Sequence, residues 1–593
     1  MKFSSKITFL ASLAGWSSAA ILEADIDAGT IRGGMCDVGN STQFLGIPYA
    51  IPPEGELRWQ APQKFNGTYQ GGTLQATRAR PICYQFGDAT ADRPPYSEDC
   101  LFLNIWVPPN ASNTTADLPV KVWIHGGGNT GGSINNPFYN GCDLADDGTI
   151  VVNVAYRLGI LGFLALESAG IAGNFGISDI LLALQWVQDN IAKFGGDKSK
   201  VLLFGESAGA WDTWIVSSLP QAPSLMRAAA MHSGGGRLWP SNATAQDAGA
   251  QFAAVANCTG PDAGECLRSI HPERLNRLSS RPGSPPLSSF GITIDAITPY
   301  IDGNVIPEQP ITAGAQVPAM FTSTATEGKF FLFLTNPNAL NLTDAEFDGF
   351  LTGELGRLGA QVSALYPASE FASFPNPGFE RASQILTDYV MKCTSYYGLM
   401  KSAEKGIPGW TYIFDHIASC PISDAITAPI AQILGPTHGF DVPYLFGHTD
   451  RFPRPNGTCS YNDQERQSVN ILVNGLTALA ATGNASTSDF NWPTFTNGSY
   501  EGLYIGQNST EIMSLTEDFS KCEFWSQVYD IVLTASETNG TNVTDEIPPD
   551  ATISATSLPT ETQPSKGFKT FEAVGNFSIV IAVVVGYILM KVV

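Results

Sequence analysis

The segment Phe204–Trp211, with the sequence FGESAGAW, places one serine between two glycines directly after the apolar run Val201–Phe204. A strand that ends in a turn too tight for flanking side chains, and then continues as a helix, holds its central residue at the tip with an exposed hydroxyl. The pattern predicts a strand–turn–helix unit with Ser207 as a candidate nucleophile. A serine that caps a helix gives the same pattern, so the rest of the chain must decide.

The apolar runs of the chain predict the fold around this turn. Six of them, separated by segments long enough for helices, read as buried strands. They lie at residues 120–124, 150–154, 201–204, 228–231, 319–322 and 410–414. A helix is expected from Ile180 to Ile191, because apolar residues recur there at three- and four-residue spacing before Gly195-Gly196. This alternation predicts an α/β protein with a large, mostly parallel central sheet flanked by helices.

Composition and the chain ends predict a secreted protein. The 55 acidic and 32 basic residues give a net charge of −23 and no basic stripe, which argues against a nucleic-acid partner. Residues 1–20 resemble a signal peptide, with lysines before a short apolar core and small residues at the end. Asn-x-Ser/Thr sequons, which mark N-glycosylation sites, are frequent. They include Asn40, Asn66, Asn110, Asn113, Asn242, Asn341, Asn456, Asn484, Asn497 and Asn508.

Residues 21–534 show no composition break and are expected to form one catalytic-sized domain. Residues 535–566 hold fifteen Ser, Thr or Pro and two further sequons, at Asn539 and Asn542, which is typical of a glycosylated stalk. Residues 567–593 end in an apolar tail. A polar spacer before such a tail favours a glycolipid-anchor signal with attachment near Ser565 or Gly567. The alternative is a short membrane span, for which fourteen apolar residues are few.

The ten cysteines, in an oxidising compartment, favour disulfides over metal ligation, since no Cys-x-x-Cys or His-x-x-x-His cluster is present. Cys83 with Cys100, and Cys258 with Cys266, are close enough in sequence to close small loops. The other six cysteines allow fifteen pairings, and the sequence does not choose among them. These are Cys36, Cys142, Cys393, Cys420, Cys459 and Cys522.

A serine nucleophile needs a base, an acid that orients the base, and donors for the oxyanion. A glycine-rich loop that offers such donors, His125-Gly126-Gly127-Gly128, follows the run 120–124. With this loop, FGESAG, EDCLFLN at 98–104, YRLG at 156–159, GN at 173–174 and FGGD at 194–197, the chain resembles the type-B carboxylesterases. This family of α/β-hydrolases includes cholinesterases and certain fungal lipases, and the chain resembles a secreted fungal member. The resemblance extends from about residue 44 to residue 439.

The resemblance implies an α/β-hydrolase fold and a set of site residues. Glu327, in Ala325-Thr326-Glu327-Gly328, matches the family's acid, although Thr326 stands where Asp is common. Among six histidines, His438 in Thr437-His438-Gly439 matches the family's base. The implied reaction is acyl transfer: Ser207 attacks, His438 takes its proton, and Glu327 orients the ring. The N–H groups of Gly127, Gly128 and Ala208 are expected to receive the oxyanion, and no metal or organic cofactor is implied.

The implied substrate is a small-molecule ester. The resemblance places the loop closed by Cys83 and Cys100 over the active site, and its residues 84–99 contain no tryptophan for a choline cation and are too few for a large lipase lid. Tyr84, Phe86 or Tyr96 is left as a weaker aromatic wall. Asn129-Thr130 and Trp211-Asp212 depart from the commoner family residues. A general carboxylesterase is therefore expected, with a lipase or sterol esterase, and a non-catalytic recognition protein, as alternatives. The oligomeric state is not predicted.

Overall fold

The computed structural model describes residues 21–87, 95–111, 115, 117–287, 297–336, 338–355, 358–420, 428–448, 460–496 and 498–538. The signal segment expected at 1–20 and the apolar tail expected at 567–593 lie outside the described residues, as does the stalk after residue 538. The same holds for Asn113, Cys459 and the sequons at Asn456, Asn497, Asn539 and Asn542. Within the described ranges, the search for a helix long and apolar enough to cross a membrane found none.

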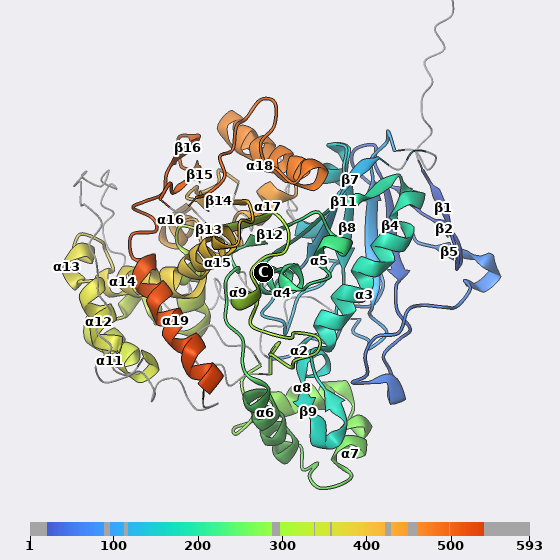
Figure 1. The fold of residues 1–593 in the computed structure, drawn as a ribbon, viewed down its shortest axis with the longest axis horizontal. Coiled ribbons are helices and arrows are strands. Elements are labelled where there is room, and N and C mark those ends of the chain that lie inside the picture. Colours follow the sequence, from blue (N-terminus) through green and yellow to red (C-terminus); the bar gives the residue numbers. More distant parts are fainter. Residues whose placement is uncertain are drawn as a thin grey trace, which may run out of the picture.

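An eleven-stranded mixed sheet forms the centre of the molecule, in the order β16-β15-β14-β13-β12-β11-β7-β8-β6-β4-β3 (Figure 1). From β8 to β15 all neighbouring strands pair in parallel, and the strands outside this range pair antiparallel. The strands are β3 (Gly34–Met35), β4 (Thr42–Pro48), β6 (Phe102–Val107), β7 (Leu118–Ile124), β8 (Ile150–Val154), β11 (Gly196–Glu206), β12 (Ala228–His232), β13 (Ala319–Thr324), β14 (Gly409–Phe414), β15 (Glu501–Ile505) and β16 (Thr510–Ser514).

All six predicted strands are present, and the predicted mostly parallel sheet is confirmed for its centre. The sequence prediction missed the antiparallel edge strands and the parallel strand β15. Among them β6 is apolar except for Asn104 and fully buried, whereas β3 has only two residues and β16 is partly exposed. Two small sheets lie outside the main one, formed by short strands. They contain β1 (Glu23–Ile26), β2 (Gly29–Arg32) and β5 (Thr73–Gln75), and β9 (Ala165–Leu166) with β10 (Ile171–Ala172).

Helices cover both faces of the sheet, as the completely buried strand β8 requires. Successive side chains of a strand point to opposite faces. In β7, Lys121 donates from Nζ to the carbonyl of Val473 in α18 (Asp463–Thr482). Its neighbour Val120 faces Ile191 at the end of α3 (Phe175–Asn190). The predicted helix at 180–191 is therefore confirmed as α3, on the face opposite α18.

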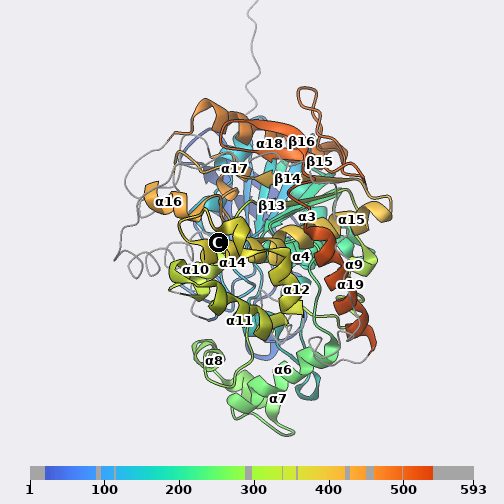
Figure 2. The ribbon, with the colours of Figure 1, turned by 90° about the vertical axis from the view of Figure 1, so that its left-hand side faces the viewer.

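The remaining helices form the periphery. Helices α6 to α8 lie together at one end of the molecule, at the bottom of Figure 1. Helices α10 to α14 lie beside the β13 half of the sheet in both views (Figures 1 and 2). Their bounds are α1 (Cys142–Asp146), α2 (Gly159–Phe163), α4 (Ala208–Ser218), α5 (Ala222–Leu225), α6 (Asn242–Val255), α7 (Ala263–Ser269), α8 (Pro272–Ser279), α9 (Pro310–Ala313), α10 (Glu327–Thr335), α11 (Asp344–Leu355), α12 (Leu358–Leu365), α13 (Ala368–Phe371), α14 (Pro377–Leu386), α15 (Cys393–Glu404), α16 (Ala428–Leu434), α17 (Val442–Leu445) and α19 (Cys522–Thr538).

Disulfides join distant parts of the chain. Both predicted loops are closed, by Cys83–Cys100 and Cys258–Cys266. The pairings that the sequence left open include Cys36–Cys142 and Cys393–Cys522, and Cys420 is also disulfide-bonded. The second of these fastens the start of α19 to the start of α15. Helix α19 continues to Thr538, so the expected boundary at 534 falls inside a helix.

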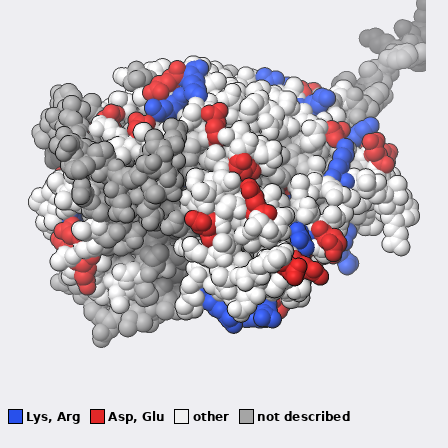
Figure 3. All heavy atoms as spheres, turned by 60° about the horizontal axis from the view of Figure 1, so that its bottom comes forward, with Lys and Arg blue, Asp and Glu red and all other residues white. Residues whose placement is uncertain are grey.

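Charges on the face shown in Figure 3 are scattered singly and in small groups among uncharged residues. The excess of 55 acidic over 32 basic residues is thus not concentrated into one patch on this face.

Candidate active site

Ser207 lies in a sharp turn between β11 and α4. Its backbone is held at φ 57° and ψ −124°, in a region that non-glycine residues rarely adopt. The flanking glycines are sterically required: a Cβ at Gly205 would lie 2.5 Å from the carbonyl carbon of Gly209, and a Cβ at Gly209 would lie 2.0 Å from the carbonyl oxygen of Ile124. The predicted strand–turn–helix unit is confirmed.

The serine itself is only 2% exposed, so the expected exposed hydroxyl is wrong for this structure. Two loops cover the turn. A Cβ at Gly126 would lie 3.0 Å from Cβ of Ser207, and a Cβ at Gly234 would lie 2.5 Å from its carbonyl oxygen. At the carboxyl edge of the sheet these loops cover the Ser207 side chain, which does not face bulk solvent.

Glu327 and His438 lie in direct contact. Oε2 of Glu327 is 2.5 Å from Nδ1 of His438, and both side chains are fully buried. The other oxygen of Glu327 accepts hydrogen bonds from Ser233 Oγ (2.5 Å) and from the backbone N–H of Thr324 (2.7 Å). Burial alone would raise the pKa of Glu327, but His438 and these hydrogen bonds outweigh burial and lower it.

The far side of the imidazole faces Glu206, the residue before the serine. Nε2 of His438 lies 3.3 Å from Oε1 of Glu206 and has no hydrogen-bond partner among the described residues. Burial would lower the pKa of His438, but the carboxyl groups of Glu206 and Glu327 outweigh burial and raise it to about 9. Burial raises the pKa of Glu206 to about 8. His438 therefore has one nitrogen fixed by Glu327 and a second that is free to exchange a proton.

The loop after β7 has the geometry of a donor cradle. Gly127 and Gly128 have φ of 114° and 63°, and a Cβ at Gly127 would lie 2.3 Å from the carbonyl oxygen of Gly131. Within the described part of the chain neither N–H group has an acceptor. Ala208 is the first residue of α4, and the first N–H groups of a helix have no acceptor within it. These three residues therefore offer unused donors near Ser207.

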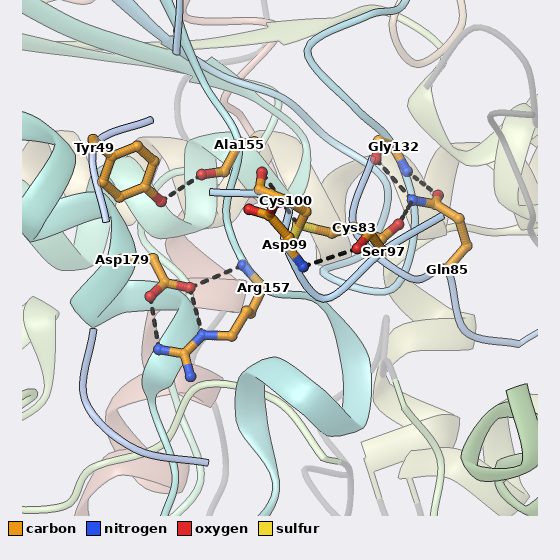
Figure 4. The surroundings of a disulfide bond; sticks show 10 residues. All are labelled: Tyr49, Cys83, Gln85, Ser97, Asp99, Cys100, Gly132, Ala155, Arg157 and Asp179. Atoms are coloured by element: carbon orange, nitrogen blue, oxygen red, sulfur yellow. Dashed lines mark hydrogen bonds and ion pairs between the residues drawn. A yellow bond between two sulfur atoms is a disulfide. The ribbon is translucent and has the colours of Figure 1, made fainter. Parts of the chain in front are cut away.

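The Cys83–Cys100 loop supports this cradle from outside (Figure 4). Nε2 of Gln85 donates to the carbonyl of Gly132, and Oε1 of Gln85 accepts from the N–H of Gly132 at 2.7 Å. The N–H of Phe86 donates to the carbonyl of Thr130. Phe86 is fully buried, so it is no wall of an open pocket. The described part of the disulfide loop thus fixes the backbone that follows the glycines.

The two departures from the commoner family residues meet in space. Nδ2 of Asn129 donates to Oδ1 of Asp212 at 3.0 Å, and the Tyr156 hydroxyl donates to Oδ1 of Asn129 at 3.1 Å. All three residues are buried. Burial raises the pKa of Asp212 to about 8. The pair links the glycine loop after β7 to α4, and the sequence showed both unusual residues without showing that they touch.

Four of the five other histidines are engaged elsewhere or held neutral, and the ring of the fifth, His271, lies 6.4 Å from that of Tyr84. His125 and His232 are buried, and burial lowers their pKa values to about 4 and about 3. His416 contacts Glu465 at 2.9 Å, and His448 contacts Asp143 at 2.9 Å. Among the described histidines, His438 is the one that contacts Glu327, the acid that follows β13.

Sequence reasoning missed three supporting residues, Glu206, Ser233 and Asp441. Glu206 was visible as the neighbour of Ser207. Asp441 accepts a hydrogen bond from the Tyr412 hydroxyl at 2.6 Å, and burial raises its pKa to about 6. Ser233 sits at φ 53° directly after β12. Their roles depend on strand ends that are far apart in sequence, so no local pattern indicates them.

Comparison with known proteins agrees with this geometry. The model of the carboxylesterase family matches residues 20–525. The chain is 31% identical to para-nitrobenzyl esterase of Bacillus subtilis over 79% of this chain and 92% of that protein. It is 32% identical to fumonisin B1 esterase of Sphingopyxis macrogoltabida over 69% and 72%, and 30% identical to cholinesterase of Mus musculus over 85% and 86%.

Proposed function

This chain belongs to the carboxylesterase family and is a carboxylic-ester hydrolase, and we propose that it acts through an acyl-enzyme on Ser207, with His438 as base and Glu327 as orienting acid. The contact between Oε2 of Glu327 and Nδ1 of His438 carries the proposal. It leaves Nε2 as the proton acceptor, which is the tautomer that a serine nucleophile requires. The small-molecule substrate is an ester.

In the first half of the reaction Ser207 Oγ forms a bond to the ester carbonyl carbon while its proton passes to Nε2 of His438. The carbonyl oxygen becomes an oxyanion, which the N–H groups of Gly127, Gly128 and Ala208 bind. The tetrahedral intermediate then breaks its bond to the alcohol oxygen, and His438 returns the proton to that oxygen. Glu327 stays ionised and stabilises the imidazolium.

The second half repeats these steps with water. His438 takes a proton from water as the oxygen attacks the acyl carbon, the same donors bind the oxyanion, and the bond to Ser207 Oγ breaks with return of the proton. The acid product leaves and the free enzyme is restored. Every proton transfer uses Nε2 of His438.

The proposal is tested with purified protein and aryl esters from acetyl to long-chain acyl. Ser207→Ala is expected to lower kcat/KM by at least about a thousandfold on every member, since the residual rate comes from binding and the oxyanion donors alone. Ser217→Ala is the control, because this buried serine lies in the same helix α4 and its hydroxyl donates to the carbonyl of Trp214 one turn earlier in that helix. Equal activity of Ser207→Ala and Ser217→Ala contradicts the proposal.

Sequons and disulfides support a proposal on location. Six described sequon asparagines are exposed, and Asn242 is partly exposed, so their side chains are accessible to glycosylation. The exposed ones are Asn40, Asn66, Asn110, Asn341, Asn484 and Asn508. Four described disulfides are compatible with the secretory pathway. A secreted glycoprotein with a C-terminal glycolipid anchor is expected to be released from cells by phosphatidylinositol-specific phospholipase.

A further inference from the structure

Arg237 lies on the loop that follows β12, close to the proposed catalytic residues. The loop begins at Ser233, which donates to Glu327, and continues with Gly234, which packs on the carbonyl oxygen of Ser207. Trp239, at the other end of the loop, is held by the side chain of Gln309. The backbone N–H of Trp239 donates to Oε1 of Gln309 at 3.0 Å, and the backbone carbonyl of Trp239 accepts from Nε2 of Gln309 at 2.6 Å. The backbone around Arg237 is therefore anchored.

Two tryptophans hold the guanidinium group. Cζ of Arg237 lies 4.3 Å from the ring centroid of Trp211 and 5.2 Å from that of Trp239. Trp211 is one helical turn beyond Ser207, and the backbone N–H of Trp211 donates to the carbonyl of Ser207 at 3.0 Å. The two indole rings meet edge to face at 6.4 Å. Both indole rings lie against the guanidinium group and limit its movement, and an aromatic face does not use up its N–H donors.

Those donors have no acceptor in the described part of the chain. No carboxylate lies within ion-pair distance of Arg237 and no hydrogen bond from it is found there, whereas buried Arg157 pairs with Asp179 at 2.7 Å. Nε1 of Trp239, in the same cluster, also has no described hydrogen-bond partner. Burial lowers the pKa of Arg237 to about 10, so the group remains charged at neutral pH.

A partly buried charge without a counter-ion costs free energy that a bound anion recovers. With 55 acidic residues in the chain, a shortage of partners does not explain an unpaired arginine on the loop that packs against Ser207. The fixed planar edge matches a carboxylate, which accepts two parallel hydrogen bonds. We infer that Arg237 binds a carboxylate group of the substrate, so that the enzyme prefers anionic esters; this rests on the proposed role of Ser207.

The buried acids nearby do not oppose an anionic substrate. Burial raises the pKa values of Glu206 and Asp212 to about 8, so both are mostly uncharged at neutral pH. Glu327 is ionised but faces His438 and its donors. Asp441, whose pKa is about 6, is mostly ionised at neutral pH, but it interacts with His438 and accepts a hydrogen bond from the Tyr412 hydroxyl. Arg237 is therefore a charged group with no counter-ion within ion-pair distance in the described part of the chain.

Two matched pairs of esters test the inference. The first is the butanoyl ester of 4-hydroxybenzoate against that of its methyl ester, which places the carboxylate on the alcohol side. The second is the mono-4-nitrophenyl ester of suberic acid against the same compound with its free carboxyl group methylated. This pair places the carboxylate on the acyl side. In Arg237→Gln, kcat/KM is expected to fall by about tenfold to a hundredfold for the anionic member of at least one pair, the loss typical of an unpaired charged hydrogen bond, and by less than about threefold for neutral members.

Arg227→Gln is the charge-matched control, because Arg227 precedes β12 at its opposite end and bonds to the carbonyl of Ser199. It is expected to leave all four rates unchanged. Equal losses on charged and neutral members, or no loss, overturn the inference. If Arg237→Gln does not fold, the wild type decides: benzoate, and not benzamide, must slow labelling of the enzyme by a fluorophosphonate, and equal effects overturn the inference.

Failure of this inference is distinguishable from failure of the proposed function. The carboxylate site alone is rejected if Ser207→Ala abolishes hydrolysis of neutral esters while Arg237→Gln leaves the ratio of kcat/KM between anionic and neutral esters unchanged. Absence of hydrolysis on every ester, without fluorophosphonate labelling of Ser207, rejects both.

Discussion

At the scale of single residues, the site is a row of buried carboxyl groups around one imidazole. Glu327 is ionised because three donors and His438 compensate its burial. Glu206, with no hydrogen bond to either oxygen among the described residues, stays protonated up to about pH 8. Two carboxyl groups on either side of one ring thus have opposite pKa shifts, set by the hydrogen bonds that Glu327 has and Glu206 lacks among the described residues.

The pH dependence of kcat/KM is expected to report His438. The ring must be neutral to accept the serine proton, so activity rises as pH increases through its pKa of about 9 and falls toward acid. Glu206→Gln removes a carboxylate that raises this pKa, so the rising limb moves to lower pH. A limb that stays in place, or moves to higher pH, contradicts this assignment.

Sequence analysis reached most residues of the candidate site but not their electrostatics. Ser207, Gly127 and Gly128 belong to local patterns with a steric reason: a Cβ would clash at Gly127 and at the two glycines that flank Ser207, and Gly128 has a positive φ of 63°. Glu327 and His438 came from family resemblance, and the structure brings them into contact. The pKa shifts of Glu206 and Asp212 depend on complete burial, which no local pattern indicates.

At the scale of elements, the oxyanion loop is held from two sides, by the Cys83–Cys100 loop and by α4. The parallel centre of the sheet was predictable because its strands are continuous apolar runs. The pairing of Cys36 with Cys142 and the pairing of β6 with β4 and β8 were not, because they depend on contacts between segments far apart in sequence.

Replacing Cys83 and Cys100 together by alanine is expected to lower both stability and kcat. The chain-entropy cost of losing a disulfide across 17 residues is about 3 kcal/mol, and Gln85 then no longer fixes Gly132. The Cys258, Cys266 double replacement is the control: it costs about 2.5 kcal/mol for its shorter loop but lies beside α7, away from the site, and is expected to keep kcat. Thermal unfolding and steady-state kinetics separate the two. Equal kcat losses in both variants reject the supporting role of the first loop.

Asp212 is expected to make stability depend on pH. Its folded pKa of about 8 lies above its ordinary value of 3.8, so the folded state holds a proton that the unfolded state loses. Its contribution is therefore fully present below pH 3.8 and is lost as pH rises toward 8. Asp212→Asn keeps the contact to Asn129 and should flatten the decrease of Tm between pH 5 and 8. Asp197→Asn, at a partly exposed carboxylate, serves as control. An unchanged slope in Asp212→Asn contradicts the shift.

At the scale of the whole molecule, one sheet supplies every candidate group from its carboxyl edge. Helix α19 closes the described fold, with Trp525 donating to the Tyr366 hydroxyl at 2.9 Å and Tyr529 donating to the carbonyl of Tyr389 at 2.6 Å. Cys522 in the same helix is bonded to Cys393. These contacts make α19 part of the domain. The sequence predicted a domain end at residue 534, which falls inside this helix.

Truncation is expected to separate the folded domain from the segment after residue 538. Residues 21–538 keep α19 and its disulfide, so this fragment should match the full chain in Tm and in kcat/KM on a neutral ester. Residues 21–520 lose Cys522 and the contacts of Trp525 and Tyr529. That fragment is expected to unfold at a clearly lower temperature. Equal stability of the two fragments contradicts the role given to α19.

The measurement that tests the central claim most directly is the identification, by peptide mass spectrometry, of the residue labelled by a fluorophosphonate in the wild type. The account predicts a single adduct on Ser207, with loss of esterase activity in proportion to labelling and a much slower reaction in His438→Ala. An adduct on another residue, or full labelling without loss of activity, would contradict it.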